Sequence, residues 1–215
     1  MPVLIMGPSG SGKTYSIKNF KPEEVGVISV EKGRLPFKSE IKVVKIPING
    51  TGDGKENYGA INRAKYAWLM QAIKTAKCKS IVIDDSQYLL VNELFDRSAE
   101  KGYDKYTQMA ANFRNLIHSI NELPEDDKIV YFLHHTETGP DGREKAKTIG
   151  KMLDEKLTVE GCFDIVIYCQ DHKFYTQANG MSTAKSPEGM LELEMVNDLK
   201  QVDDAIREYW GLGGK

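Results

Sequence analysis

The chain has 215 residues, of which 40% are hydrophobic and 28% are charged, and its formal net charge is −2. This length suits a single domain over residues 1–215, large enough to bury a core without disulfide or metal staples. The near-neutral charge excludes a global field that attracts nucleic acid, so any such site would be a local patch.

Short apolar runs alternate with longer amphipathic segments, which predicts a mainly parallel sheet covered by helices. In chain order we predict a strand at 3–6, a helix at 14–19, strands at 25–30 and 43–48, a helix at 60–76, a strand at 81–83, helices at 89–101 and 106–122, strands at 129–133, 165–168, 173–177 and 190–195, and a helix at 198–210.

The last predicted helix has an apolar stripe, and Asn197 precedes it as a predicted N-cap. Two glycine-containing polar segments, 50–58 and 137–150, are predicted to be loops. Three cysteines without C-x-x-C spacing indicate free thiols in a reducing compartment. Because no apolar run approaches the roughly 18 residues of a membrane span, we expect a cytoplasmic protein without a membrane partner.

A glycine-rich segment links the first predicted strand to the first helix and matches G-x-x-x-x-G-K-[ST]. This context predicts a loop whose backbone N–H groups surround phosphate oxygens, next to a positive helix N-terminus. Lysine in this pattern reaches the terminal phosphates, and the threonine hydroxyl ligates Mg²⁺. The predicted nucleotide-binding residues are Gly7, Pro8, Ser9, Gly10, Ser11, Gly12, Lys13 and Thr14.

Two aspartates end the apolar strand in "KSIVIDDSQ". We predict that Asp84 holds Mg²⁺ together with Thr14, and that Asp85 polarises the attacking water. A shift of one residue would give Asp85 the metal instead, and sequence leaves this alternative open. A simpler interpretation is that these aspartates only cap the N-terminus of the following helix. The glycine-rich loop upstream favours a nucleotide site instead.

Two further strands end in polar residues, at the edge where ligands bind in α/β sheets. Glu31 ends "VGVISVE" and is predicted to deprotonate the water that attacks the γ-phosphate, although it could be a solvated charge. His134 and His135 end "IVYFLHH" and are predicted to sense the γ-phosphate, although an ordinary strand-to-loop transition explains them equally well.

In this order, the glycine-rich loop, the strand ending in Glu31, the "IVIDDS" strand and the "YFLHH" strand resemble those of RecA-like ATPases. More narrowly, the chain resembles the core-only RecA-like ATPases of bacteriophages, some of which are grouped as single-strand annealing recombination proteins. The resemblance implies a RecA-like P-loop fold with a C-terminal antiparallel hairpin, ATP and Mg²⁺ as cofactors, ATP hydrolysis, a homo-oligomer and, for a phage protein, the host cytoplasm.

The resemblance also implies roles for two later stretches. In "STAKSPEGMLELEM", Lys185 would reach the ATP site of a neighbouring subunit as an arginine finger does, or be a solvated hairpin residue. The "ETGPDGREKAKTIGK" stretch would contact single-stranded DNA through Arg143, Lys145 and Lys147, although its acids neutralise most of this charge.

Other functions share the same glycine-rich loop. "GPSGSGKT" is similar to the loop of nucleoside monophosphate kinases, but the arginines that would form their lid are scattered along this chain. A transporter ATPase is disfavoured because no L-S-G-G-Q signature occurs. A binding module that hydrolyses nucleotide slowly, as an accessory factor for another protein, remains an alternative.

Overall fold

A computed structural model of the chain describes residues 1–31, 33–47, 58–125 and 127–213. Within these residues, nine strands form a sheet in the order β3-β2-β4-β5-β1-β7-β8-β9, with β6 paired to β5 outside this path. The strands are β1 (Pro2–Gly7), β2 (Val25–Ser29), β3 (Val43–Lys45), β4 (Ser80–Asp84), β5 (Ile129–Thr138), β6 (Glu144–Ala146), β7 (Ile165–Gln170), β8 (Lys173–Tyr175) and β9 (Glu194–Val196).

The sheet is parallel from β3 through β7 and antiparallel where β8 and β9 are added at one edge. The helical elements are η1 (Thr14–Asn19), α1 (Tyr58–Thr75), α2 (Tyr88–Asp96), α3 (Asp104–Asn121), α4 (Lys151–Asp154), η2 (Val159–Cys162) and α5 (Leu199–Trp210). The predicted α/β fold, with a mainly parallel sheet, flanking helices and C-terminal antiparallel strands, is therefore confirmed.

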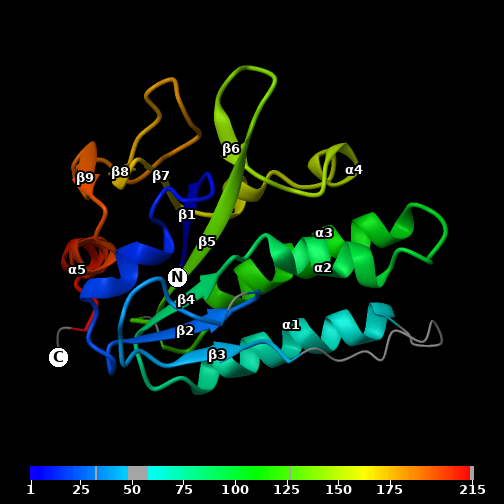
Figure 1. Cartoon of the computed structure of the whole chain (residues 1–215), viewed down its shortest axis with the longest axis horizontal. Coiled ribbons are helices and arrows are strands. Elements are labelled where there is room, and N and C mark those ends of the chain that lie inside the picture. Colours follow the sequence, from blue (N-terminus) through cyan, green and yellow to red (C-terminus); the bar gives the residue numbers. More distant parts are fainter. Residues whose placement is uncertain (32, 48–57, 126, 214–215) are drawn as a thin grey trace.

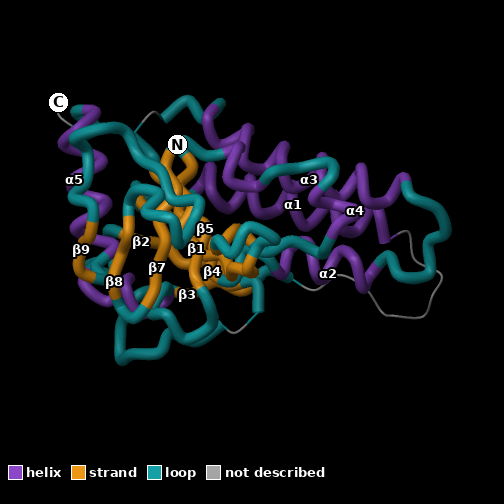
Figure 2. Tube along the Cα trace, turned by 90° about the horizontal axis from the view of Figure 1, so that it is seen from above, coloured by secondary structure: helices purple, strands orange, loops and turns teal. Residues whose placement is uncertain are grey.

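Helices cover both faces of the sheet (Figure 1). In Figure 2, α1, α2 and α3 lie together at one side of the strands, and α5 lies at the other end. Side chains alternate across β1, so that Leu4 and Met6 join the core beneath α1 and α3 while Val3 and Ile5 join the core beneath α5. Strand β1 is therefore buried between two packed layers, and the segment that follows it begins there.

Several predicted boundaries need correction. The segment at 14–19 is a 3₁₀ helix of six residues, so it aligns too few peptide dipoles for the strong helix N-terminus expected there. The helix predicted to reach residue 101 ends at Asp96, and the Lys105 ammonium donates to the carbonyls of Arg97 and Glu100 in the turn that follows, at 3.1 and 2.9 Å. The strand predicted at 190–195 is displaced to β9.

Two predicted loops also have different outcomes. Most of the 137–150 segment is an antiparallel hairpin, because β5 continues to Thr138 and β6 pairs with it. Residues 50–57 of the predicted loop and residue 48 of the strand predicted at 43–48 lie outside the described residues, while residue 58 already begins α1. Asp198, not Asn197, caps α5, since its carboxylate accepts the Lys200 backbone N–H. None of the described helices is long and apolar enough to cross a membrane.

Candidate functional site

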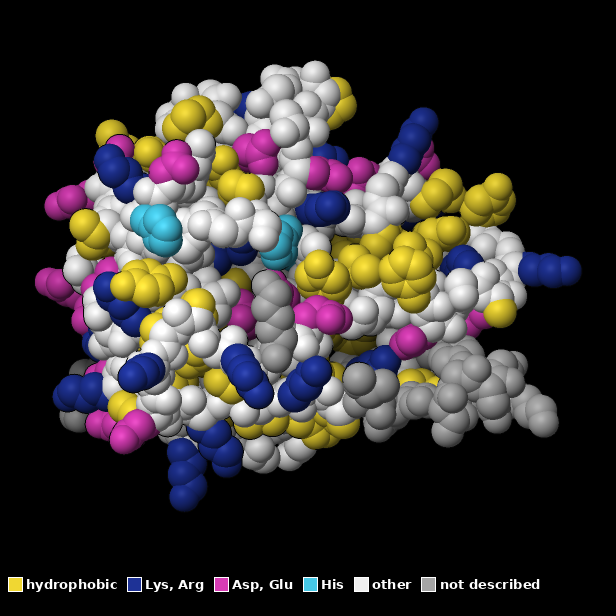
Figure 3. Space-filling view, in the orientation of Figure 1, with side chains coloured by type: hydrophobic (Ala, Val, Ile, Leu, Met, Phe, Trp, Pro, Cys, Tyr) yellow, Lys and Arg dark blue, Asp and Glu magenta, His cyan; other side chains and the backbone are white. Residues whose placement is uncertain are grey.

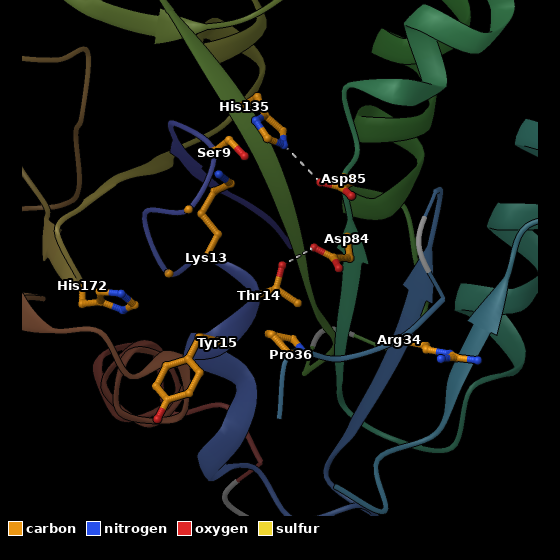
Figure 4. Close-up of a pocket in the computed structure, with 12 residues that line it drawn as sticks. Ser9, Lys13, Thr14, Tyr15, Arg34, Pro36, Asp84, Asp85, His135 and His172 are labelled. Atoms are coloured by element: carbon orange, nitrogen blue, oxygen red, sulfur yellow. Dashed lines mark hydrogen bonds and ion pairs between the residues drawn. The ribbon is translucent and has the colours of Figure 1, made fainter. Parts of the chain in front are cut away.

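A cavity of about 330 Å³ opens where the parallel strands end, the usual ligand position in such sheets. Figure 4 shows the loop after β1 on one side of it and the end of β4 on the other. Its volume lies in the range of small-ligand pockets. The lining residues are Ser9, Gly10, Gly12, Lys13, Thr14, Tyr15, Arg34, Pro36, Asp84, Asp85, His135 and His172.

Two glycines of the loop after β1 are required by their surroundings. A Cβ on Gly7 would lie 2.2 Å from the Cys169 carbonyl oxygen, and a Cβ on Gly12 would lie 2.2 Å from Nδ2 of Asn197. Gly12 also has a φ of +105°, which side-chain-bearing residues rarely adopt. The loop is thus pressed against β7 and the C-terminal segment of the chain.

The Lys13 ammonium lies inside the curve of this loop. Nζ donates to the carbonyls of Gly7 and Pro8, at 2.7 and 2.8 Å, and the residue is only 6% exposed. A buried ammonium held by loop carbonyls concentrates positive charge at the cavity wall. The cavity therefore suits an anionic group, which would replace these carbonyls as the hydrogen-bond partner of the Lys13 ammonium.

Thr14 and Asp84 meet across the cavity floor. The Thr14 hydroxyl donates to Oδ1 of Asp84 at 2.9 Å, and Asp84 is nearly buried at the end of β4. Hydroxyl and carboxylate oxygens are the donors that Mg²⁺ prefers, and this ion is usually completed by substrate phosphates and water. No cluster of three or more His, Cys, Asp or Glu that could hold a metal ion occurs among the described residues.

Asp85 and His135 form a second polar pair in the cavity. His135 Nε2 lies 3.1 Å from Oδ1 of Asp85, and the Tyr88 ring packs edge-on against the imidazole. Asp85 has a φ of +60°, so its backbone is in the left-handed region as the chain turns from β4 toward α2. Strained residues that persist at cavities are candidates for function.

The family comparison agrees with this geometry. A model described as an AAA domain, AAA_24, matches residues 1–190. The chain belongs to the AAA_24 family. No curated protein matches it. Membership identifies a P-loop ATPase-type domain, for which nucleotide binding, typically with Mg²⁺, is the general property.

Within this AAA_24 domain, the structure separates the two predicted sensor histidines. His135 lines the cavity, whereas His134 is fully buried on the other side of β5, where Nε2 lies 2.8 Å from the Lys147 carbonyl and Nδ1 lies 2.9 Å from the Ser86 hydroxyl. Burial lowers the pKa of His134 to about 4, so its ring is neutral at pH 7. Only His135 is placed to meet a ligand.

The predicted water-activating Glu31 also lies apart from the cavity. Its carboxylate is half-buried and accepts the Asn92 amide of α2 at 2.8 Å, and Glu31 is not among the described lining residues. Lys185 does not line the cavity of its own chain either. Its side chain is exposed, and its backbone pairs with Val166 through two hydrogen bonds of 2.8 Å.

The predicted DNA-binding stretch projects from the AAA_24 domain as the β5–β6 hairpin (Figure 1). Two of its cations have acidic partners: Arg143 pairs with Asp141 at 2.7 Å, and Lys145 pairs with Glu137 at 3.2 Å and with Asp154 of α4 at 3.0 Å. On the face drawn in Figure 3, Lys and Arg side chains gather instead over β2 and β3. The hairpin is therefore a weak electrostatic feature.

Sequence reasoning missed several residues at the site. Tyr15 directly follows the glycine-rich loop in the sequence, and this position alone could have indicated that it lies at the site. Pro36 and Arg34 lie in the connection after Glu31, while His172 lies in the turn between β7 and β8. Asp171 and His172 both have positive φ, as a two-residue hairpin turn requires, but the turn lacks the glycine that usually marks one.

Proposed function

We propose that the protein binds ATP together with Mg²⁺ in this cavity and hydrolyses ATP to ADP and phosphate. The observation that carries this proposal is that one cavity brings together the glycine-rich loop with its buried lysine, the Thr14–Asp84 pair and the Asp85–His135 pair. The loop and its lysine would bind phosphate, the Thr14–Asp84 pair would hold a hard cation, and the Asp85–His135 pair would orient water.

The phosphates would bind along the Gly7–Thr14 loop. Backbone N–H groups of the loop and the Lys13 ammonium would neutralise their charge, with Lys13 giving up the carbonyls of Gly7 and Pro8 for phosphate oxygens. Thr14 would ligate Mg²⁺ directly, and Asp84 would hold it through water. When bound, this ion neutralises charge on the phosphate oxygens that accumulates as the terminal bond breaks.

The attacking water would be held by Asp85. Its carboxylate would accept a hydrogen bond and then a proton from the water as the new bond to the γ-phosphorus forms and the bond to the ADP oxygen breaks. His135 would donate its Nε2–H to the same carboxylate and fix its orientation. The sequence predicted Glu31 as the base for this step, but in the present structure its carboxylate accepts a hydrogen bond from Asn92.

Tyr15 is proposed to contact the nucleobase. In Figure 4 it lies at the end of the cavity opposite His135, and its ring packs edge-on against His172 at 5.9 Å. A Tyr15→Ala variant should bind ATP roughly tenfold more weakly, because stacking on a base is worth about 1–3 kcal/mol. Titration calorimetry should give an unchanged affinity for tripolyphosphate, which has no base. The exposed Tyr103→Ala is the control, and equal losses for ATP and tripolyphosphate would contradict this role.

Single-stranded DNA and a second copy of the chain are the proposed partners. Arg143, Lys145 and Lys147 would contact DNA phosphates, and the exposed Lys185 would reach the ATP site of a neighbouring subunit. Because Arg143 and Lys145 already have acidic partners, the hairpin would supply few phosphate contacts and a shallow salt dependence.

One experiment tests the whole proposal. ATP turnover is measured with and without single-stranded DNA, while sedimentation follows oligomer size with a non-hydrolysable ATP analogue. We expect turnover that DNA accelerates and oligomers that need the nucleotide. Lys147→Ala should reduce the acceleration more than Lys45→Ala, a matched change on β3; the reverse order would move the DNA site to the β2–β3 surface. Turnover that ignores DNA in a protein that stays monomeric would refute both partners.

A further inference from the structure

We propose that Asn197 is a positioning residue that holds the glycine-rich loop in its nucleotide-binding shape and ties that loop to α5. The inference rests on the proposed nucleotide function and deepens it. Asn197 lies between β9 and α5, beyond the residues 1–190 that match the AAA_24 family. The C-terminal segment would therefore be a working part of the site as well as a cover for the sheet.

The contact is direct and has little room for change. Nδ2 of Asn197 donates to the Gly12 carbonyl at 3.0 Å, and the same carbonyl accepts the Ser16 backbone N–H at 3.0 Å. Nδ2 also occupies the space beside Gly12 that a Cβ would need, 2.2 Å from the ideal position. The absence of a side chain at Gly12 is thus what lets the Asn197 amide reach the loop.

The neighbouring carbonyl of the loop is held in the same way. The Ser11 carbonyl accepts the His172 backbone N–H at 3.1 Å and the Cys169 thiol at 3.3 Å. Burial raises the pKa of Cys169 to about 11, so the thiol keeps its proton and remains a donor. Two consecutive carbonyls, those of Ser11 and Gly12, are therefore bound by groups outside the loop.

This arrangement determines where the loop presents its donors. In a planar trans peptide the carbonyl oxygen and the following N–H point in opposite directions. Holding the Ser11 and Gly12 carbonyls toward β7 and Asn197 turns the N–H groups of Gly12 and Lys13 the other way. Gly12 and Lys13 both line the cavity, so these donors would face the phosphates.

Asn197 is itself fixed at the base of α5. The next residue, Asp198, is the N-cap of α5, and its carboxylate accepts the Lys200 backbone N–H. Leu199, Val202 and Ile206 bury the helix in the core beneath the sheet. The donor therefore lies directly before a helix that is packed into the core.

The test compares Asn197→Ala and Asn197→Asp with Asn19→Ala. The first two remove the Nδ2 donor, and the aspartate also adds negative charge beside the phosphate loop. Asn19→Ala removes an amide hydrogen bond between α5 and η1 that does not touch the loop. For both Asn197 variants the KM for ATP and the Kd for tripolyphosphate should rise roughly threefold to tenfold or more, with kcat nearly unchanged.

The outcomes separate this inference from the proposed function. Asn19→Ala should keep the KM for ATP of the unaltered protein, and all three variants should melt within a few degrees of it without nucleotide. An unchanged KM for Asn197→Ala, or an equal rise for Asn19→Ala, would overturn the positioning role alone. Failure of the unaltered protein to bind ATP or tripolyphosphate would overturn the proposed function and this role with it.

Discussion

A Lys13→Ala variant should bind ATP at least roughly a hundredfold more weakly and show no measurable turnover. The ammonium supplies buried positive charge to the phosphate loop, and a water molecule in its place would carry no charge. Its removal would also leave the carbonyls of Gly7 and Pro8 without the donor that they have in the present structure. Titration calorimetry with ATP and Mg²⁺ measures the loss.

Lys21→Ala is the matched control, because this exposed lysine follows η1 and its side chain lies outside the cavity lining. It should bind ATP as the unaltered protein does. Far-ultraviolet circular dichroism of Lys13→Ala excludes unfolding as the cause of lost binding. A folded Lys13→Ala protein that binds ATP normally would remove the phosphate loop from the proposed mechanism.

An Asp85→Asn variant should retain ATP affinity and lose at least about a hundredfold in kcat, since a positioned base contributes 10²–10⁴. Asparagine has the shape of aspartate and tolerates the left-handed backbone that Asp85 adopts with its φ of +60°. The substitution therefore tests the carboxylate charge without disturbing the turn. Turnover at saturating ATP, with KM measured alongside, separates catalysis from binding.

Glu31→Gln is the informative comparison. This carboxylate accepts a hydrogen bond from Asn92 and does not line the described cavity, so its substitution should change kcat only a few-fold. The opposite result, a large loss for Glu31→Gln beside a small loss for Asp85→Asn, would return the base role to Glu31. It would also require the end of β2 to move toward the nucleotide during turnover.

The parts of the site that sequence predicted are those that the covalent chain holds together. Gly7–Thr14 is one continuous loop, and Asp84 follows an apolar strand directly, so spacing alone placed both at one edge of the sheet. The parallel sheet was predictable for a similar reason, because buried strands such as β1 and β4 have continuous apolar residues at their centres.

Other parts depend on contacts between distant segments. Nothing near Glu31 in the sequence indicates that Asn92 will bind its carboxylate, and nothing near His134 indicates that its ring will face the Lys147 carbonyl. The contacts of His172 and Asn197 with the phosphate loop depend on the pairing of β7, β8 and β9. Such tertiary contacts leave no local periodicity, which is why the loop motif was predicted and its supports were not.

Strand β5 has a mechanical consequence. It runs unbroken from the core past His135 to Thr138 at the base of the projecting hairpin, and the Lys147 N–H bonds back to the His135 carbonyl at 2.8 Å. These backbone hydrogen bonds couple the position of His135 to that of Lys147 and the returning strand. A movement of His135 on loss of the terminal phosphate would therefore be passed to the base of the hairpin.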